Sequence, residues 1–462
     1  MSQATRRRVS EKVKSLRESD ALPFHEILDP EMVKSALASA GVTYNERIYT
    51  PFVTLCMFLW QVLDPDHSCS GAVARLIVWM VLNGRQPCSA DSTSYCEARL
   101  RLLLEVIVEL VHQTAAKVEA GVPDEWLWKG RKVALVDGTT VSMPDTPENQ
   151  EAFPQPRSQR PGLGFPVARL VAVISLATGV VRDLAMGPYK GKKTGEPALF
   201  RTLLDGLKSG GIVLGDRYFA SFFMLALLLR GGVDGLFRMH QRRKFDFRRG
   251  RRLSTEDHVV KWKKPARPAW MDEGTYEQIP NELEVRELRF QVQQPGYRVN
   301  ELVLVTTLLD PEEYTTEELA DLFLQRWNIE LDLRSIKTVM QMDILRCKTP
   351  EMVRKEVWIH LLAYNLIRGV MAEAAEAHSL RPRELSFKGA LQTMTAFQDM
   401  LRRAKSLERR RLVKVMLESI AQHRVGDRPG RVEPRANKRR PKPQKFLMEP
   451  RKQARKRLLP AA

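Results

Sequence analysis

The sequence contains few of the residues that build disulfide-linked or zinc-binding proteins. Only 5 of its 462 residues are cysteines, and no two of them form a C-x-x-C pair. An odd number of cysteines without such a pair is typical of reduced thiols in a cytosolic protein. The 8 histidines are scattered and indicate no metal site.

Long apolar stretches are absent too. The longest, around Leu55–Leu63 and Leu76–Leu82, are shorter than the ~20 residues that cross a bilayer. The polar and basic N-terminus is not followed by the apolar segment of a signal peptide. We therefore expect a cytoplasmic protein that makes no membrane contact.

Two common enzyme motifs are also missing. Neither G-x-S-x-G nor another nucleophile motif occurs. The stretch "GPYKGKKTG" begins at Gly187 and looks like a phosphate-binding loop. However, three residues rather than four separate its first two glycines, and Lys193 precedes Thr194. We therefore expect no ATP binding.

Acidic residues are outnumbered by basic ones, which gives the chain a net charge of +19. More than half of this excess lies in residues 421–462, where 14 Lys or Arg face 3 acidic residues and interspersed prolines prevent one continuous helix. A second basic cluster, "RMHQRRKFDFRRGRRL", runs from Arg238 to Leu253. A solubility tail is the simpler alternative, but two separate clusters favour a polyanion such as nucleic acid as partner.

The spacing of apolar residues divides the chain into segments. Residues 1 to about 125 have helical spacing, and the period of two that follows indicates three strands, a helix, a strand, a helix and a strand. Residues 241–306 are polar and β-like, and helices run from Thr316 to about 420. We therefore predict a helical N-terminal domain (1–125), a core in two parts (126–240 and 307–420, the second with C-terminal helices), a β-rich insertion (241–306) and a basic, proline-containing tail (421–462).

This order of elements is that of an α/β protein with a ribonuclease-H-like core. Such a core carries metal-binding carboxylates after its first strand, after its fourth strand and on a late helix. Asp137 follows "VALV", Asp216 follows "IVLG", and Glu330 lies on the late helix. Two Mg²⁺ ions, which are ~3.5–4 Å apart in two-metal sites, require hard oxygen ligands of this kind.

Each of these acids has a structural alternative. Asp137 and Gly138 between β-like runs could form a type I′ hairpin turn. Asp216 could cap the helix that follows it. Glu330 could be half of a buried ion pair with Arg326, one helical turn away. The joint placement of the three acids in the right order favours the metal site.

The stretch "RWNIELDLRSIK", from Arg326 to Lys337, predicts two faces when it is read as a helix. The solvated face holds polar residues only: Gln325, Asn328, Asp332 and Ser335. The opposite face holds the apolar residues Trp327, Ile329, Leu333 and Ile336, and among them a stripe formed by Phe323, Arg326, Glu330 and Lys337. Charged residues on the inner face of a helix indicate a site.

The spacing of Arg326, Glu330 and Lys337, with three and then six residues between them, matches a known signature. It resembles the Tyr-Arg-Glu-Lys signature of bacterial DDE-type insertion-sequence transposases, insertion-sequence family four. Flanking stretches are similar too, among them "VDGTTVSMPDT", "GEPALFRTLLDGL" and "GDRYFASFF", and the resemblance covers roughly residues 130–445. The signature tyrosine is replaced by Phe323, which has no hydroxyl to offer a DNA phosphate.

The resemblance implies cut-and-paste movement of a DNA element. Asp137, Asp216 and Glu330 would hold two Mg²⁺ ions, for which Mn²⁺ can substitute, while Arg326 and Lys337 would contact phosphates beside the cut. Partners would be the element ends, target DNA and a second copy of the chain, in the bacterial cytoplasm at the nucleoid. The candidate DNA contacts are Arg326, Lys337, Phe323, Arg217, Trp327, Arg242, Arg243, Arg248 and Arg249.

Several expectations are open to alternatives. Trp262 and Trp270 could stack on an extruded base or could pack the β-rich insertion. The N-terminal domain, with its basic start "TRRRVSEKVKSLR", could read the element ends or mediate dimerisation. Rival functions are a catalytically inactive, domesticated DNA-binding derivative and another nuclease with a ribonuclease-H-like core.

Overall fold

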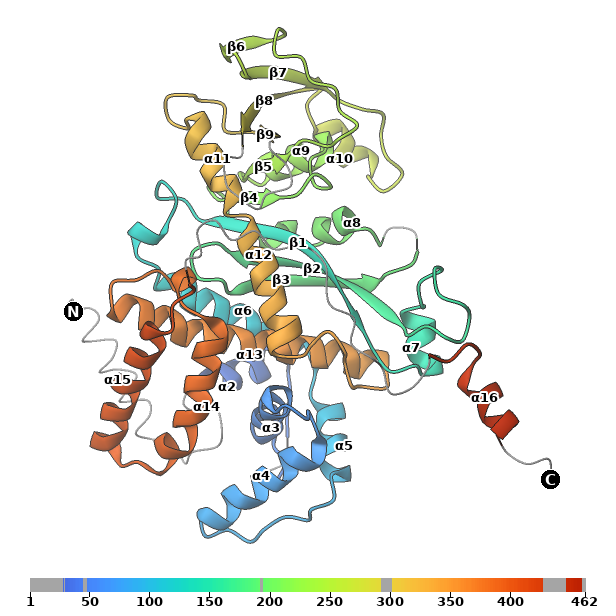
Figure 1. Ribbon diagram of the computed structural model, residues 1–462, viewed down its shortest axis with the longest axis vertical. Coiled ribbons are helices and arrows are strands. Elements are labelled where there is room, and N and C mark those ends of the chain that lie inside the picture. The colour runs from blue at the N-terminus through green and yellow to red at the C-terminus, as the bar shows by residue number, and fades with distance from the viewer. Residues whose placement is uncertain are drawn as a thin grey trace.

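The computed structural model describes residue 28 and residues 30–44, 48–191, 194–291, 301–426 and 446–458. In these segments the protein is a mixed α/β structure in which helices surround a nine-stranded sheet of order β3-β2-β1-β4-β5-β9-β8-β7-β6 (Figure 1). Its strands are β1 (Val133–Ser142), β2 (Val167–Ser175), β3 (Val181–Pro188), β4 (Ile212–Gly215), β5 (Asp234–Arg238), β6 (Arg251–Ser254), β7 (Asp257–Lys263), β8 (Glu282–Gln291) and β9 (Glu301–Thr306).

The helices before and within the sheet region are α2 (Pro30–Ser39), α3 (Pro51–Leu63), α4 (Cys69–Leu82), α5 (Thr93–Arg101), α6 (Leu104–Ala120), α7 (Pro147–Ala152), α8 (Glu196–Arg201), α9 (Phe222–Arg230) and α10 (Glu273–Gln278). Those after it are α11 (Thr316–Leu324), α12 (Trp327–Arg334), α13 (Pro350–Ala377), α14 (Phe387–Arg403), α15 (Ser406–Gln422) and α16 (Arg451–Leu458). Among the helices of the described segments, none is both long and apolar enough for a bilayer crossing.

Strands β1 to β5 have the predicted order along the chain. β1 and β2, and β2 and β3, pair antiparallel, whereas β4 lies parallel to both β1 and β5. The parallel connections pass through α8 and α9, as parallel strands require. The prediction of an α/β fold with helices after the strands is confirmed at this level.

The two faces of the sheet carry separate cores. Leu135, Leu214 and Leu236 belong to a buried cluster that includes α6, α12 and α13. Val136 and Val213, one residue along, belong to a second cluster with α9. Successive side chains of a strand point to opposite faces of the sheet, so alternate residues belong to different cores. The same rule tells on which face a side chain near the end of a strand lies.

Every described element before β1 is helical. Helices α2, α3 and α6 contribute to the same buried cluster as α13, and the Lys355 ammonium of α13 donates to the Leu100 carbonyl (2.8 Å). These helices therefore pack directly on the core. The basic start of the chain lies outside the described residues, as do 292–300 of the insertion and 427–445 of the tail.

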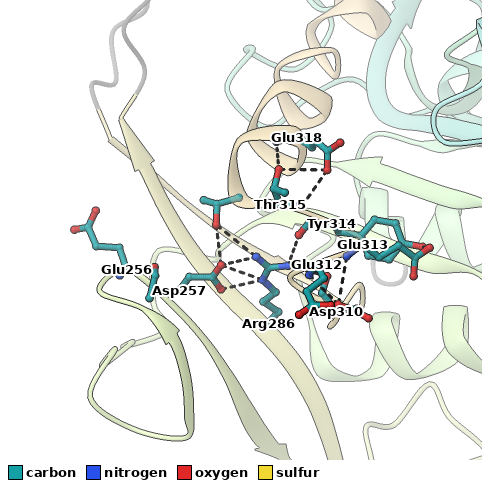
Figure 2. Close-up of polar contacts among 11 residues, drawn as sticks. Glu256, Asp257, Arg286, Asp310, Glu312, Glu313, Tyr314, Thr315 and Glu318 are labelled. Carbon is teal, nitrogen blue, oxygen red and sulfur yellow. Dashed lines mark hydrogen bonds and ion pairs between the residues drawn. The ribbon is translucent and has the colours of Figure 1, made fainter.

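The β-rich segment continues the central sheet, because its last strand, β9, pairs with β5. A buried ion pair joins its strands to the start of α11 (Figure 2). The Arg286 Nε of β8 donates to Asp257 Oδ1 (2.9 Å), and its Nη1 donates to the Tyr314 carbonyl (2.6 Å). Thr316 of α11 also donates to Asp257 (2.8 Å).

Because Arg286 and Asp257 are almost fully buried, removing one charge leaves the other without compensation. We expect Arg286→Met to lower the free energy of unfolding by about 3–5 kcal/mol, measured by urea denaturation. The double variant Asp257→Leu/Arg286→Met should recover part of this loss, since neither charge remains.

A matched control lies on the same sheet. Lys261 and Glu282 form a solvent-exposed pair (3.8 Å), so Lys261→Met should cost less than about 1 kcal/mol. Equal losses for Lys261→Met and Arg286→Met would contradict a stabilising role for the buried pair.

Candidate active site

The register of three parallel strands places three charged residues side by side. Leu135, Leu214 and Leu236 are neighbours across β1, β4 and β5. Two residues after each leucine come Asp137 in β1, Asp216 just after β4 and Arg238 at the end of β5. The sheet therefore brings together the first two predicted acids.

Asp137 lies within β1, where it is paired with Ala172 of β2. The hairpin-turn alternative for Asp137 and Gly138 is therefore wrong, because the strand continues to Ser142. β4 ends at Gly215, so the end of β1 with Asp137 extends past its shorter neighbour. This leaves the Asp137 carboxylate, whose side chain is 20% exposed, at the edge of an open region.

Asp216 directly follows β4 and begins a turn. Its Oδ1 accepts from the Tyr218 amide (2.7 Å), and its carbonyl accepts from the Phe219 amide (3.2 Å). The N-cap of α9 is Ser221, whose hydroxyl accepts from the Met224 amide (3.2 Å). The alternative that Asp216 caps this helix is therefore wrong.

The predicted late helix is divided in two. α11 ends at Leu324 and α12 begins at Trp327, with short-range bonds such as Arg326 N to Phe323 O (3.0 Å) between them. α12 then crosses β1 (Figure 1). Because of this break, the side chains of α12 point in other directions than they would in one continuous helix.

Arg326 connects the helix to the strand. Its Nη2 donates to Glu330 Oε1 (2.9 Å), and its Nη1 lies 3.5 Å from Asp137 Oδ2. The Arg326–Glu330 pair of the structural alternative thus exists. It is only partly buried, since the Glu330 side chain is 38% exposed, and it joins two of the predicted acids.

Lys337 lies in a π-helical turn over Ser335–Val339, an irregularity that often occurs at functional sites. Its ammonium donates to the Thr139 hydroxyl (3.1 Å), two residues past Asp137 on β1. Burial lowers the pKa of Lys337. The signature cation therefore lies next to the acids although it comes from a different turn.

Phe323 and Trp327 differ in exposure. Phe323 is 5% exposed and packs in the core, in agreement with its predicted place on the inner face. Trp327, expected on the buried face, is 41% exposed and remains available to a ligand. The helix break between them explains the difference.

Asp332 was expected on the solvated face, and this is wrong. It is fully buried, with Oδ1 accepting from the Tyr364 hydroxyl (3.0 Å) and from Arg368 of α13. Its Oδ2 accepts from Arg383 Nη1 (2.6 Å), and Arg383 also donates to the Ser175 carbonyl at the end of β2 (2.7 Å). Asp332 therefore attaches α12 to two other parts of the core.

Glu196 is a fourth carboxylate that the residue-by-residue analysis missed. It is the first residue of α8, and its Cδ would lie 2.4 Å from a Cβ at position 138. A side chain at position 138 would displace the Glu196 carboxylate from its present place. The only sequence signal was its position in the stretch "GEPALFRTLLDGL".

The carboxylates influence one another. Burial, with smaller contributions from Asp216 and Glu196, raises the pKa of Asp137 to about 6, although the Gly138 amide and Arg326 oppose the shift. Burial and the Asp216 charge also raise the pKa of Glu196, whereas Arg169 opposes the shift. The ionised carboxylates are thus disfavoured by burial and by mutual repulsion, and a bound cation would reduce both effects.

The donor chemistry fits a hard divalent cation, because the acids offer carboxylate oxygens. Within the described ranges, however, no three His, Cys, Asp or Glu side chains converge closely enough to hold a metal ion. Arg326 lies between Asp137 and Glu330 and compensates their charge.

The remaining candidate DNA contacts lie on the loop after β5 and its surroundings. Arg217 donates to Gln241 Oε1 (2.8 Å), Arg242 is exposed, and Arg248 and Arg249 pair with Asp246. The Arg243 guanidinium lies over the Trp262 ring (3.5 Å).

The two tryptophans of the insertion differ in exposure. Trp262 is 3% exposed and donates to Glu287 Oε1 (2.8 Å), so it packs the insertion. Trp270 is 37% exposed, with the Arg201 guanidinium over its ring (3.7 Å). Of these two, Trp270 alone is placed where a base could reach it.

Comparison with known proteins places this arrangement in a class. Residues 128–366 match the transposase DDE domain family. The chain is 31% identical over 367 residues to transposase InsG for insertion sequence element IS4 of Escherichia coli (strain K12), covering 78% of this chain and 79% of that protein. It is 38% identical over 69 residues to the transposase for insertion sequence element IS421 of Escherichia coli, covering 15% of this chain and 19% of that protein.

The chain therefore belongs to the DDE transposases, metal-dependent enzymes that cut DNA and transfer strands, and within them to the IS4 group. The predicted family and enzyme class are confirmed. The structure is also similar to a piggyBac transposase synaptic complex with hairpin DNA, over 89% of this chain and 85% of that chain, at 11% identity and a TM-score of 0.42.

Because Asp332 is fully buried and compensates Arg368 and Arg383, Asp332→Asn should lower the free energy of unfolding by about 3–5 kcal/mol. Asp321→Asn, at an exposed position of α11, makes the same chemical change and should leave it unchanged. Urea denaturation of both variants tests this. Equal stabilities would mean that the buried cluster does not hold α12.

Proposed function

We propose that this transposase cuts the ends of its own element and joins them to target DNA at the site formed by Asp137, Asp216 and Glu330. The observation that carries the proposal is the pair of acids on adjacent parallel strands with Arg326 linking one of them to Glu330. The strand order also supports assigning the core to the ribonuclease-H-like fold.

The three acids would hold two Mg²⁺ ions, or Mn²⁺ in their place. When bound, such ions supply a water nucleophile and stabilise the attacking and leaving oxygens of an in-line displacement. Glu330 sits on a helix that is attached to the core through Asp332, so its carboxylate is held toward the sheet.

Arg326 and Lys337 would bind DNA phosphates on either side of the acids. Arg326 can exchange its carboxylate partners for phosphate oxygens, because a guanidinium binds both in the same two-bond geometry. Lys337 is held by a single neutral hydroxyl, that of Thr139, and keeps donors for an anion. Both would position the strand to be cut.

The proposal also covers the partners of the protein. Double-stranded DNA, as element ends and as target, would be bound by a homodimer. The N-terminal helical domain (1–125) would contribute end recognition or subunit contacts. The intact acids argue against an inactive DNA-binding derivative, since binding alone does not require them.

The decisive variant is Glu330→Gln, which keeps the shape of the side chain but removes its charge. We expect metal-dependent cleavage of element-end duplexes to fall by a factor of about 10²–10³ or more, because one charge at the reacting centre is removed. Binding to uncleaved end DNA should persist. Gel assays of cleavage and of binding measure the two effects separately.

Glu317→Gln is the matched control, because Glu317 is an exposed acid of α11. It should cut at the normal rate. If Glu330→Gln cuts normally, Glu330 does not belong to the reacting centre and the proposed set of acids is incorrect.

The basic tail should supply DNA affinity that does not depend on sequence. The residues from 427 onward hold 13 Lys or Arg. Arg424 forms an ion pair with Glu384, so the deletion should begin after it. Deleting residues 427–462 should therefore flatten the plot of log affinity against log salt, by up to about 0.9 for each phosphate that the tail neutralises in the full-length protein.

A second tail variant separates charge from length. Replacing Lys438, Arg439 and Arg440 by Gln should flatten the slope in part, while preference among DNA sequences stays the same. A deletion that leaves the slope unchanged would indicate that the tail serves subunit contacts instead.

A further inference from the structure

Arg238, the first residue of the basic cluster 238–253, is a cation of the site that the Tyr-Arg-Glu-Lys signature does not include. It is the last residue of β5, and the pairing of Gly215 with Phe237 puts it beside Asp216. Leu236, two residues earlier, faces the cluster that also contains α12. The Arg238 side chain therefore leaves the sheet on the same face as Asp137.

The Arg238 guanidinium differs from the other cations of the site in its hydrogen bonding. It is half-buried, yet in the part of the chain that the structure describes no carboxylate, carbonyl or hydroxyl accepts from it within hydrogen-bond distance. At the other end of β5 the pattern is different, because Asp234 is paired with Arg131 (2.5 Å). An arginine so placed keeps all five donors for a ligand.

Its surroundings add a reason to expect an anion. Burial lowers the pKa of Arg238, and the nearby charges of Arg217 and Arg326 lower it further, with only Asp216 opposing. Two other guanidiniums and the Asp216 carboxylate thus act on Arg238 at once. Like charges at short range repel, and a phosphate placed among them would relieve the repulsion.

We propose that Arg238 binds the DNA phosphate next to the one that is cut, on the β5 side of Asp216. This rests on the proposed function, because it takes Asp137 and Asp216 to be at the scissile phosphate. Neighbouring strands are about 4.8 Å apart, so Arg238 on β5 lies one strand spacing from Asp216 and two from Asp137. Its planar guanidinium suits two phosphate oxygens at once.

The test combines a protein variant with DNA that lacks one charge. Full-length protein is titrated, without metal ion, with duplexes of its own element end that carry a neutral methylphosphonate at one position each. The wild-type protein should bind more weakly when the charge is removed at any of several positions, including the one beside the cut. Arg238→Gln should bind the unmodified duplex about 10-fold or more weakly.

The informative result is the coupling between the two changes. Arg238→Gln should show no further drop in affinity when the phosphate beside the cut is neutral, while it stays sensitive at the other positions. Arg238→Lys, which keeps the charge but not the paired donors, should recover part of the affinity. Arg230→Gln, an exposed cation of α9 on the opposite face, is the control and should bind as the wild type does.

Two outcomes would overturn the inference. Wild-type affinity in Arg238→Gln would show that the side chain binds no phosphate. A uniform loss at every position, with no phosphate becoming insensitive, would show that Arg238 acts through the fold; thermal unfolding of the variant would then occur at a lower temperature as well. Because no cleavage is measured, this result is independent of whether Glu330→Gln abolishes cutting, which tests the proposed function.

Discussion

The parallel pairing of β4 with β1 and β5 is the constraint on which the site depends. It sets the register in which Asp137, Asp216 and Arg238 end up side by side, and a shift by one residue would turn these side chains to the opposite face. Since β4 ends at Gly215, β1 extends past it on that side, and the Asp137 side chain keeps 20% of its surface exposed. A short central strand thus makes room for chemistry in an otherwise buried sheet.

Helix α12 has two charged sides with opposite roles. One side carries Asp332, which is buried against Arg368 and Arg383 and attaches the helix to α13 and the end of β2. The other side carries Glu330, which remains partly exposed over β1. A buried carboxylate surrounded by two guanidiniums resists rotation of the helix, so the position of Glu330 is set by a contact made two residues away.

The candidate site combines partly buried carboxylates with several cations, as the proposed function requires. Arg217, Arg238, Arg326 and Lys337 lie around carboxylates that are partly buried and, for Asp137 and Glu196, have raised pKa values. Acids that repel one another favour divalent cations, and cations without acid partners favour phosphate. Both kinds of charge are needed where metal ions and a DNA strand meet.

The sequence by itself determined the family and the order of the strands and named three candidate acids, because strand periodicity and the Arg-Glu-Lys spacing are local patterns. The tertiary structure decided the rest. One helical period, applied across the break at Gln325–Arg326, misplaced Asp332 and Trp327, whose partners and exposure depend on residues such as Arg368 and Arg383, 36 and 51 positions from Asp332. Glu196 was missed for the same reason, and Arg238, though the first residue of the basic cluster 238–253, could not be placed beside Asp216: strand register and the approach of α8 over Gly138 are contacts between distant segments, and no local pattern records them.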